Sequence, residues 1–317
     1  MKFVFFGTPE FAATVLEKLI AAGYVPAAIV CNPDKQVGRK QVLTPPPTKI
    51  LAGKYGINIL QPEILANYEL PIANYEPDLA IIAAYGKIIP KTILDIPKHG
   101  FINIHASLLP KYRGASPIQY AILNGDKETG ITIMKVDEEM DHGPLLGKSE
   151  IRISKFETYE NLSQKLAILG AKLLTKIIPD YIDGKIKLVE QDHSKATFAK
   201  IIKKEDGKID WSKSAEEIEM MTRAYYPWPT AYTYLKSQNS NLKTTDKNLK
   251  LLKIFEADIV NGGDKKIGEV FLKNNELAVQ CGENILIIKK LQLEGGKILS
   301  AKEFLNGRKD FTRSILQ

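Results

Sequence analysis

The first half of the chain alternates short apolar runs with stretches in which apolar residues recur every three or four positions. Lys2–Phe6 and Val25–Val30 have the composition of buried strands, and Leu79–Ala84 lacks polar alternation, which suits a strand covered on both faces. Phe11–Ala22 has helical spacing and ends before Gly23. Strands that alternate with helices predict a parallel sheet with helices on both faces, which is a Rossmann-like α/β fold.

Two further apolar runs, Phe101–His105 and Ile131–Val136, extend the predicted sheet. The segment Glu157–Asp183 places leucine and isoleucine side chains on one side of a long helix, and Gly184 follows it as a helix-end signal. This helix would cover the sheet and close a first domain, which we expect to span residues 1–189.

The second half of the chain has a different character. Residues 190–206 are polar and lysine-rich, which predicts a linker. Residues 207–317 contain one short predicted helix, Ser214–Tyr225, a polar hairpin loop at 237–248, and a series of short strand-like runs. These runs are Ala231–Leu235, Leu249–Glu256, Gly268–Phe271, Leu277–Cys281 and Ile285–Leu293. The pattern predicts a second domain that is a small β-barrel or sandwich.

The composition excludes several classes of protein. No apolar run is long enough to cross a membrane, and Phe3–Phe6 is too short for a secretory signal, so we expect an unprocessed cytoplasmic protein. Cys31 and Cys281 have no neighbouring metal-ligand residues, which argues against a metal site or disulfide framework and suits a reducing compartment. The formal net charge of +7 is compatible with a nucleic-acid partner, but many lysine-rich enzymes carry such a charge for solubility.

A glycine turn, Phe6-Gly7-Thr8-Pro9, joins the first strand to the first helix, where a nucleotide-binding loop would lie. The three-glycine dinucleotide fingerprint and the phosphate loop ending in Lys-Ser/Thr are both missing. The segment therefore argues against a nicotinamide-dependent enzyme, and a plain strand-to-helix turn accounts for much of it.

The strand Phe101–His105 contains two polar residues near its carboxyl end, where α/β sheets place their chemistry. Side chains alternate along a strand, so Asn103 and His105 point to one side while Ile102 and Ile104 point to the other. A lone histidine is commonly a core residue satisfied by the backbone. The nearby asparagine and the long loop that follows favour a functional site instead.

The loop Ala106–Pro117 offers backbone donors and apolar surface, which suit a flat, partly apolar ligand. Its charged cluster, Lys111-Tyr112-Arg113, is expected to be solvated.

Acidic residues follow the strand Ile131–Val136, ahead of a Gly-Pro turn. If this strand neighbours the histidine strand, one of them can reach His105, orient its ring and raise its pKa. Asp141 is the preferred candidate because the bend behind it fixes its position, but Asp137 stays open. His142 is a competing catalytic base.

Several segments together resemble the methionyl-tRNA formyltransferase family. The matching stretches are FGTPEFA at 6–12, NPDKQVGRK at 32–40, AAYGKIIP at 83–90, INIHASLLPKYRGASPIQ at 102–119, TGITIMKVDEEMDHG at 129–143, IDW at 209–211 and YYPWPTAY at 225–232. The stretch from 103 to 119 is highly specific for folate-dependent formyl transfer. The basic loop and the YPWP segment narrow the resemblance toward the enzyme that acts on tRNA.

The resemblance implies roles for particular residues. The catalytic residues would be Asn103, His105 and Asp141. The wall against the tetrahydrofolate would include Ser107, Leu108, Leu109 and Pro110, and the pterin would lie by Tyr85, Gly86 and Ile88. The loop at 34–48 would approach the tRNA acceptor stem with the cations Arg39 and Lys40. The domain at 207–317 would be an OB-like barrel that also touches tRNA.

The resemblance also implies the reaction, in which 10-formyltetrahydrofolate is the co-substrate, initiator methionyl-tRNA is the acceptor, and no metal takes part. A monomer is expected. The alternatives are a formyltransferase for a sugar-nucleotide or ribonucleotide amine, a non-catalytic RNA-binding protein, and a hydrolase of formyl-folate. The chain departs from the family pattern where Lys40 is followed by Gln41-Val42 rather than by more basic residues. Recognition of tRNA would then depend more on the second domain.

Overall fold

The computed structural model describes residues 1–38, 40–236 and 249–317. The polar hairpin loop expected at 237–248 lies outside the described residues, and so does Arg39. The chain divides into two compact units. The first comprises Met1–Ile118, Lys127–Ile153 and Asn161–Ile201, and the second comprises Gln119–Asp126, Ser154–Glu160 and Ile202–Gln317.

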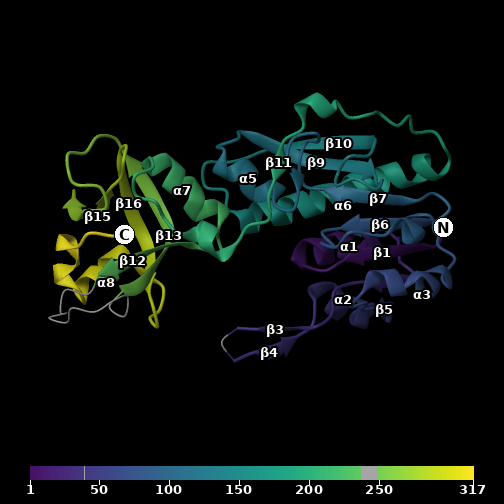
Figure 1. Ribbon diagram of the computed structural model, residues 1–317, viewed down its shortest axis with the longest axis horizontal. Coiled ribbons are helices and arrows are strands. Elements are labelled where there is room, and N and C mark those ends of the chain that lie inside the picture. The colour runs from purple at the N-terminus through teal and green to yellow at the C-terminus, as the bar shows by residue number, and fades with distance from the viewer. Residues whose placement is uncertain (39, 237–248) are drawn as a thin grey trace. The chain divides into compact units, whose positions relative to one another are not determined.

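The first unit is built on a seven-stranded sheet in the order β10-β9-β7-β6-β1-β2-β5 (Figure 1). Its strands are β1 (Phe3–Gly7), β2 (Ala28–Val30), β5 (Asn58–Leu60), β6 (Leu79–Ala83), β7 (Phe101–His105), β9 (Glu128–Lys135) and β10 (Leu145–Arg152). The five strands from β5 to β7 are parallel, which confirms the predicted Rossmann-like α/β class. β9 is antiparallel to β7, and β10 is antiparallel to β9.

The antiparallel edge formed by β9 and β10 is a feature that the sequence did not predict. The chain leaves β7 at His105 and re-enters the sheet beside that residue, because Thr132 of β9 is the partner of His105. To form a parallel neighbour, the chain would have to return to the end of the sheet at which β7 begins before it entered the next strand. The connection from β7 to β9 does not do so. β9 consequently ends where β7 begins, with Lys135 opposite Ile102. Any residue that follows β9 must fold back to reach His105.

Helices pack on both faces of this sheet. On one face α6 (Tyr159–Ile182) lies close to β7, because a Cβ on Gly170 would be only 2.7 Å from Ile104 Cγ2. On the other face, Phe6, Tyr85 and Phe101 belong to a core cluster that includes residues of α3 and α4. The shorter helices of the chain's first half are α1 (Glu10–Ala21), α2 (Pro47–Tyr55), α3 (Glu69–Ala73), α4 (Lys91–Leu94) and α5 (Pro117–Leu123).

The remaining elements of the first unit are short and lie outside the main sheet. They are the hairpin β3 (Lys35–Val37) and β4 (Val42–Thr44), the pair β8 (Arg113–Gly114) and β11 (Phe198–Ala199), and the 3₁₀ turns η1 (Leu65–Asn67) and η2 (His193–Lys195). β8 and β11 pair in parallel across a large sequence separation.

The second unit contains an antiparallel sheet in the order β12-β13-β16-β15-β14, with β17 paired to β16. Its strands are β12 (Ala231–Lys236), β13 (Leu249–Val260), β14 (Val270–Lys273), β15 (Glu276–Gln280), β16 (Ile285–Leu293) and β17 (Leu299–Ser300). Its helical elements are α7 (Ala215–Ala224), α8 (Ala301–Asn306), η3 (Lys204–Gly207) and η4 (Lys309–Arg313). The antiparallel β-sheet domain is confirmed, and its OB-like topology stays a prediction.

The helices α7 and α8 each begin with a reciprocal capping box. The Ser214 hydroxyl accepts from the Glu217 N–H at 3.1 Å, and the Glu217 carboxylate accepts from the Ser214 N–H at 3.1 Å. Ser300 and Glu303 repeat the arrangement at the start of α8. Each box satisfies backbone donors that a helix start otherwise leaves unpaired, which explains why the helices begin at these residues.

Within the described ranges, the helices are all too short or too polar to traverse a lipid bilayer.

Candidate active site

The carboxyl end of β7 brings two side chains onto one oxygen atom of a third. Asn103 Nδ2 donates to Asp141 Oδ1 at 3.3 Å, and His105 Nδ1 lies 3.5 Å from the same oxygen. The side chain of His105 is 6% exposed and that of Asp141 is 14% exposed. The structure therefore brings together the three residues predicted to be catalytic, in a setting that excludes most of the solvent.

His105 has one ring nitrogen committed to the backbone. Nε2 lies 2.9 Å from the Tyr112 carbonyl oxygen. A carbonyl oxygen only accepts, so this hydrogen bond requires the proton to be on Nε2. The neutral ring then presents the lone pair of Nδ1 to Asp141. A second proton would bind at Nδ1, where the carboxylate stabilises the positive charge.

Asp141 is held by the backbone through its other oxygen. The Gly114 N–H donates to Asp141 Oδ2 at 2.7 Å. Asp141 itself has a φ of 52°, in the left-handed region that non-glycine residues rarely adopt. Gly143 packs so closely onto β9 that a Cβ there would lie 2.0 Å from the Lys135 carbonyl oxygen. This tight fold of the loop at 136–144 carries Asp141 back from the end of β9 to β7.

The structure separates Asp141 from the other candidates that the sequence left open. Asp137 Oδ2 lies 2.7 Å from His142 Nδ1, so these two residues pair with each other. The His142 ring stacks on the His193 ring with 4.1 Å between centroids and 5° between planes. Asp141, rather than Asp137 or His142, is the residue that contacts His105.

The loop that follows β7 is held in shape by β9. Thr132 Oγ1 donates to the Ser107 carbonyl at 2.7 Å and accepts from the Leu109 N–H at 3.1 Å. Lys148 Nζ donates to the Leu109 carbonyl. Ser107 and Leu109 are buried, whereas Leu108 and Pro110 are partly exposed. Ser107 and Leu109 therefore fix the loop, whereas Leu108 and Pro110 have surface that a ligand could contact.

The three residues predicted to lie by the pterin differ in exposure. Tyr85 is 2% exposed, and its ring meets Phe6 edge-on with 5.4 Å between centroids. Gly86 is exposed with a φ of 77°, and Ile88 is 91% exposed. Gly86 and Ile88 are therefore accessible to a ligand, while the Tyr85 ring supports their loop from the core.

The Tyr85 hydroxyl is a buried polar group for which no hydrogen-bond partner is found among the described residues. Burial, which disfavours the charged phenolate, raises the pKa of Tyr85 to about 12. The Tyr85 carbonyl, in contrast, accepts from Asn32 Nδ2 at 3.1 Å. Its backbone is thus anchored and its ring packs in the core, but burial of its unpaired hydroxyl lowers the stability of the fold.

Of the two cations predicted to contact tRNA, Lys40 lies within the described residues and Arg39 does not. Lys40 is exposed in the turn of the β3–β4 hairpin. The hairpin also exposes apolar side chains, since Val37, Val42 and Leu43 are 55%, 58% and 65% exposed. The structure does not bring this hairpin to His105 through any described contact.

Two buried residues beside Asp141 were missed by the sequence analysis. Arg113, expected to be solvated, is only 5% exposed, because its Nε and Nη2 atoms donate to Gln191 Oε1 at 3.2 and 2.7 Å. Nη2 also lies 2.8 Å from His193 Nδ1. Gln191, which lies in the segment predicted as a linker, is 5% exposed. A polar segment without periodicity carries no signal for such a contact.

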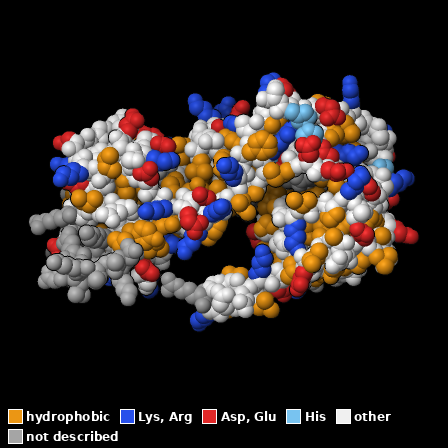
Figure 2. Space-filling view, viewed as in Figure 1, with side chains coloured by type: hydrophobic (Ala, Val, Ile, Leu, Met, Phe, Trp, Pro, Cys, Tyr) orange, Lys and Arg blue, Asp and Glu red, His pale blue; other side chains and the backbone are white. Residues whose placement is uncertain are grey.

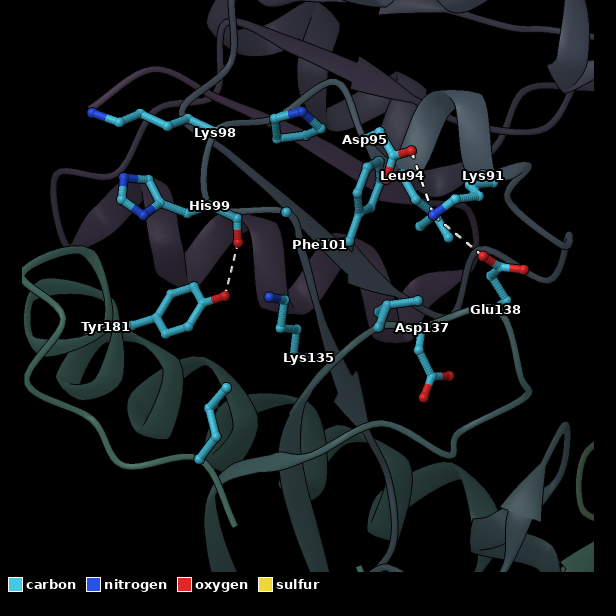
Figure 3. A pocket seen from close by; sticks show the side chains of 14 residues that line it. Lys91, Leu94, Asp95, Lys98, His99, Phe101, Lys135, Asp137, Glu138 and Tyr181 are labelled. Atoms are coloured by element: carbon cyan, nitrogen blue, oxygen red, sulfur yellow. Dashed lines mark hydrogen bonds and ion pairs between the residues drawn. The ribbon is translucent and has the colours of Figure 1, made fainter. Parts of the chain in front are cut away.

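A separate cavity of about 610 Å³ lies at the opposite end of β7, where this strand begins (Figure 3). It surrounds Phe101, the first residue of β7, and is roughly 13 Å along the strand from His105. Lys91 pairs there with Asp95 at 3.5 Å and Glu138 at 3.3 Å, and these side chains are 63–67% exposed. Exposed ion pairs of this kind are weak and screened by salt, so the cavity lacks the shielded groups found around His105.

The surroundings of His105 offer surface and hydrogen-bonding groups to an organic ligand. No group of three metal-ligand side chains occurs among the residues that the structure describes. The partly exposed Leu108 offers apolar surface, and the loop after β7 offers backbone polar groups.

The fold defines the class of protein. The formyl transferase family matches residues 1–178, and the formyl transferase C-terminal domain matches residues 201–309. The chain belongs to the methionyl-tRNA formyltransferase family.

Known proteins support this assignment over the full chain. The methionyl-tRNA formyltransferase of Thermodesulfovibrio yellowstonii is 43% identical over 308 residues, which are 96% of each chain. That of Halalkalibacterium halodurans is 45% identical over 312 residues, which are 97% of this chain and 95% of the other. The structure of an N-formyltransferase from Helicobacter canadensis in complex with folinic acid and dTDP-3-aminofucose is 20% identical and has a TM-score of 0.62. It covers 91% of this chain and 99% of that one, which shows a shared fold.

Proposed function

We propose that the protein transfers the formyl group of 10-formyltetrahydrofolate to the amino group of initiator methionyl-tRNA, giving N-formylmethionyl-tRNA for translation initiation. The observation that carries the proposal is the meeting of Asn103 and His105 at one carboxylate oxygen of Asp141. An amide donor, an imidazole and a carboxylate supply charge stabilisation and proton transfer, which are what acyl transfer between two nitrogen atoms requires.

Asn103 and His105 would stabilise the charge that develops on the formyl oxygen. The acceptor is an α-amine, a group whose pKa is ordinarily about 7.7–8.0, so a substantial fraction is uncharged and nucleophilic near neutral pH. His105 donates from Nδ1 when its ring is protonated, and at 3.3 and 3.5 Å the contacts of Asn103 and His105 with Asp141 are long, so both groups remain free to turn toward the formyl oxygen. One preorganised donor of this type is typically worth about 2.7–4 kcal/mol.

Asp141 and His105 would move the proton. The new bond joins the amine nitrogen to the formyl carbon, the bond from that carbon to N10 breaks, and the proton lost by the amine is delivered to N10. His105 Nδ1 and Asp141 Oδ1 face each other at 3.5 Å, so they can take up and return this proton. Positioned proton transfer of this kind typically contributes about 10²–10⁴-fold to the rate.

The acceptor and its binding surface complete the proposal. Arg39 and Lys40 of the β3–β4 hairpin region would contact the acceptor stem, and the net charge of +7 would favour a polyanionic partner. Ser107, Leu108, Leu109, Pro110, Tyr85, Gly86 and Ile88 would form the folate site. A monomer in the cytoplasm is part of the proposal, and the free thiols Cys31 and Cys281 are consistent with a reducing compartment.

The test uses the purified protein with 10-formyltetrahydrofolate and methionyl-tRNA, and measures N-formylmethionine. We expect His105→Ala and Asp141→Asn each to lower kcat by roughly 10²-fold or more, because both remove the proton path. Binding of the folate should be retained. His99→Ala and Asp137→Asn are the matched controls. His99→Ala removes a histidine just before the start of β7, and Asp137→Asn changes an acid in the same loop as Asp141.

Near-normal kcat in both His105→Ala and Asp141→Asn would remove the catalytic assignment. Initiator and elongator methionyl-tRNA and a nucleotide-linked amino sugar are compared as acceptors. Faster formylation of the amino sugar than of either tRNA would replace the proposed acceptor.

A further inference from the structure

Gln191 forms a bridge between a buried cation and the turn that carries Asp141. Its Nε2 donates to the Asp141 carbonyl at 2.9 Å and to the Gly143 carbonyl at 2.8 Å. Its Oε1 accepts from Arg113 Nε at 3.2 Å and Nη2 at 2.7 Å. Both amide ends are therefore used, and the side chain is closed off from solvent.

The orientation of this amide is dictated by its partners. A guanidinium only donates, so the oxygen of Gln191 must face Arg113. Backbone carbonyls only accept, so the nitrogen of Gln191 must face Asp141 and Gly143. Because Arg113 is charged, it polarises the amide and strengthens the donation from Nε2. Neither end of the side chain can be exchanged without leaving buried groups unpaired.

The turn that Gln191 holds is strained and has no regular structure of its own. Asp141 has a φ of 52°, and residues in this region persist only when their surroundings impose the conformation. Gln191 bonds the carbonyls on both sides of His142, so it spans the point at which the chain reverses. It lies 50 residues further along the chain and thus supplies a restraint from outside the loop.

We propose that Gln191 is a positioning residue that fixes the Asp141 carboxylate against His105, with Arg113 as the group that orients it. The proposal rests on the proposed catalytic role of Asp141. Gln191 touches no reacting atom, and its effect passes through the backbone of Asp141. A displacement of a catalytic group by about 1 Å can cost roughly 10²-fold in rate, so loss of this restraint should be visible in kcat.

The experiment compares Gln191→Glu with Gln191→Met. Glutamate keeps the oxygen that Arg113 needs and adds an ion pair, but it has no N–H for the two carbonyls. Methionine has a similar length and removes both functions. We expect each variant to lower kcat by roughly 10–100-fold while the KM for 10-formyltetrahydrofolate changes by less than about 3-fold. Gln191→Glu should lose less thermal stability than Gln191→Met, because its carboxylate still pairs with Arg113, so it carries the test if Gln191→Met does not fold.

The same two substitutions are then made in the Asp141→Asn protein. If Gln191 acts through the carboxylate, they should lower the residual kcat by less than about 2-fold there, because interacting groups are not additive. Full kcat in Gln191→Glu would show that Gln191 only pairs Arg113, and would overturn the proposal. An equal loss in both backgrounds would also overturn it, because the effect would not pass through Asp141.

Gln280→Glu is the matched control. Gln280 is also 5% exposed, and its Nε2 donates to two carbonyls, those of Cys281 at 2.9 Å and Asn284 at 3.2 Å, within the second unit. This change should lower stability and leave kcat unchanged. Parent-level kcat in Asp141→Asn alone would instead mark a failure of the proposed function, and this outcome is distinct from any result obtained with Gln191.

Discussion

His105 can gain or lose a proton at Nδ1 only, because Nε2 is bonded to the Tyr112 carbonyl. The period-two alternation of a strand is a local property, so the placement of Asn103 and His105 on one side could be predicted from sequence. The contact of Asp141 with His105 was also expected, but its contacts with Gln191 and Gly114, which lie 50 and 27 residues away from it, could not be predicted. Contacts of that kind depend on the fold and not on local pattern.

Tyr85→Phe is expected to stabilise the protein. A buried polar group without a partner destabilises the native state by about 1–3 kcal/mol, so removal of the hydroxyl should raise the free energy of unfolding by about 1 kcal/mol at neutral pH. The pKa of Tyr85 is about 12 in the folded state against 10.0 ordinarily. The native state therefore keeps a proton that the unfolded state releases, and stability is present below pH 10 and falls as the pH rises toward 12. Tyr85→Phe should show a weaker decline over this window in urea denaturation.

Tyr181→Phe provides the contrast for this measurement. The Tyr181 hydroxyl donates to the His99 carbonyl at 2.8 Å, so the same substitution there should lower the free energy of unfolding by about 1 kcal/mol. Equal destabilisation by both changes would mean that the Tyr85 hydroxyl is satisfied in solution.

At the scale of elements, the apolar strands could be predicted from the sequence, whereas the polar edge strand and the two-residue strands could not. β7 and β16 match the ranges expected from sequence, Phe101–His105 and Ile285–Leu293. β10 was missed because it is an edge strand with mostly exposed or half-exposed positions, which lacks a clear apolar period. β8 and β11 each contain two residues and exist only because they pair with each other. No window of sequence contains that information.

Gly114→Ala tests the contribution of the β8–β11 pair to the site. Gly114 has a φ of 111°, and a Cβ there would lie 2.6 Å from the Ala199 carbonyl oxygen. Relief of this clash must move the N–H that holds Asp141, so we expect kcat to fall by roughly 10-fold or more, together with a loss of about 1–3 kcal/mol in stability. Initial rates and urea denaturation measure the two effects.

Gly23→Ala separates backbone strain from displacement of the site. Gly23 has a φ of 88° and no atom near its Cβ position, so alanine there adds strain in open space. This variant should lose stability and keep its kcat. An unchanged kcat in Gly114→Ala as well would show that Asp141 does not depend on β8.

At the scale of the whole molecule, the sequence carries 44 Lys and Arg residues against 37 Asp and Glu residues. Lys and Arg side chains are scattered over the visible face of each unit among Asp and Glu (Figure 2). The net charge of +7 therefore acts as a general attraction for a polyanion, and local specificity must come from particular contacts.

The affinity for methionyl-tRNA should consequently fall steeply with salt. Each phosphate contact contributes about −0.7 to −0.9 to the slope of log K against log salt. We expect Lys40→Ala to weaken binding and to reduce the slope by about 1, because Lys40 is an exposed cation of the β3–β4 hairpin. Filter binding between 50 and 200 mM salt, roughly the range over which such contacts are screened, measures both.

Lys54→Ala, which removes an exposed cation at the end of α2, is the matched control and should leave the slope unchanged. If Lys40→Ala has the slope of the parent, the hairpin turn makes no phosphate contact.

The pairing of β8 with β11 has a consequence for the order in which the molecule matures. The family match for the first domain ends at residue 178, yet Gln191 and Phe198–Ala199 lie beyond it. During translation at roughly 5–20 residues per second, the sheet can assemble while these residues are still within the ribosome. A nascent chain that ended before residue 191 would lack both the amide that bonds the Asp141 turn and the strand that pairs with β8.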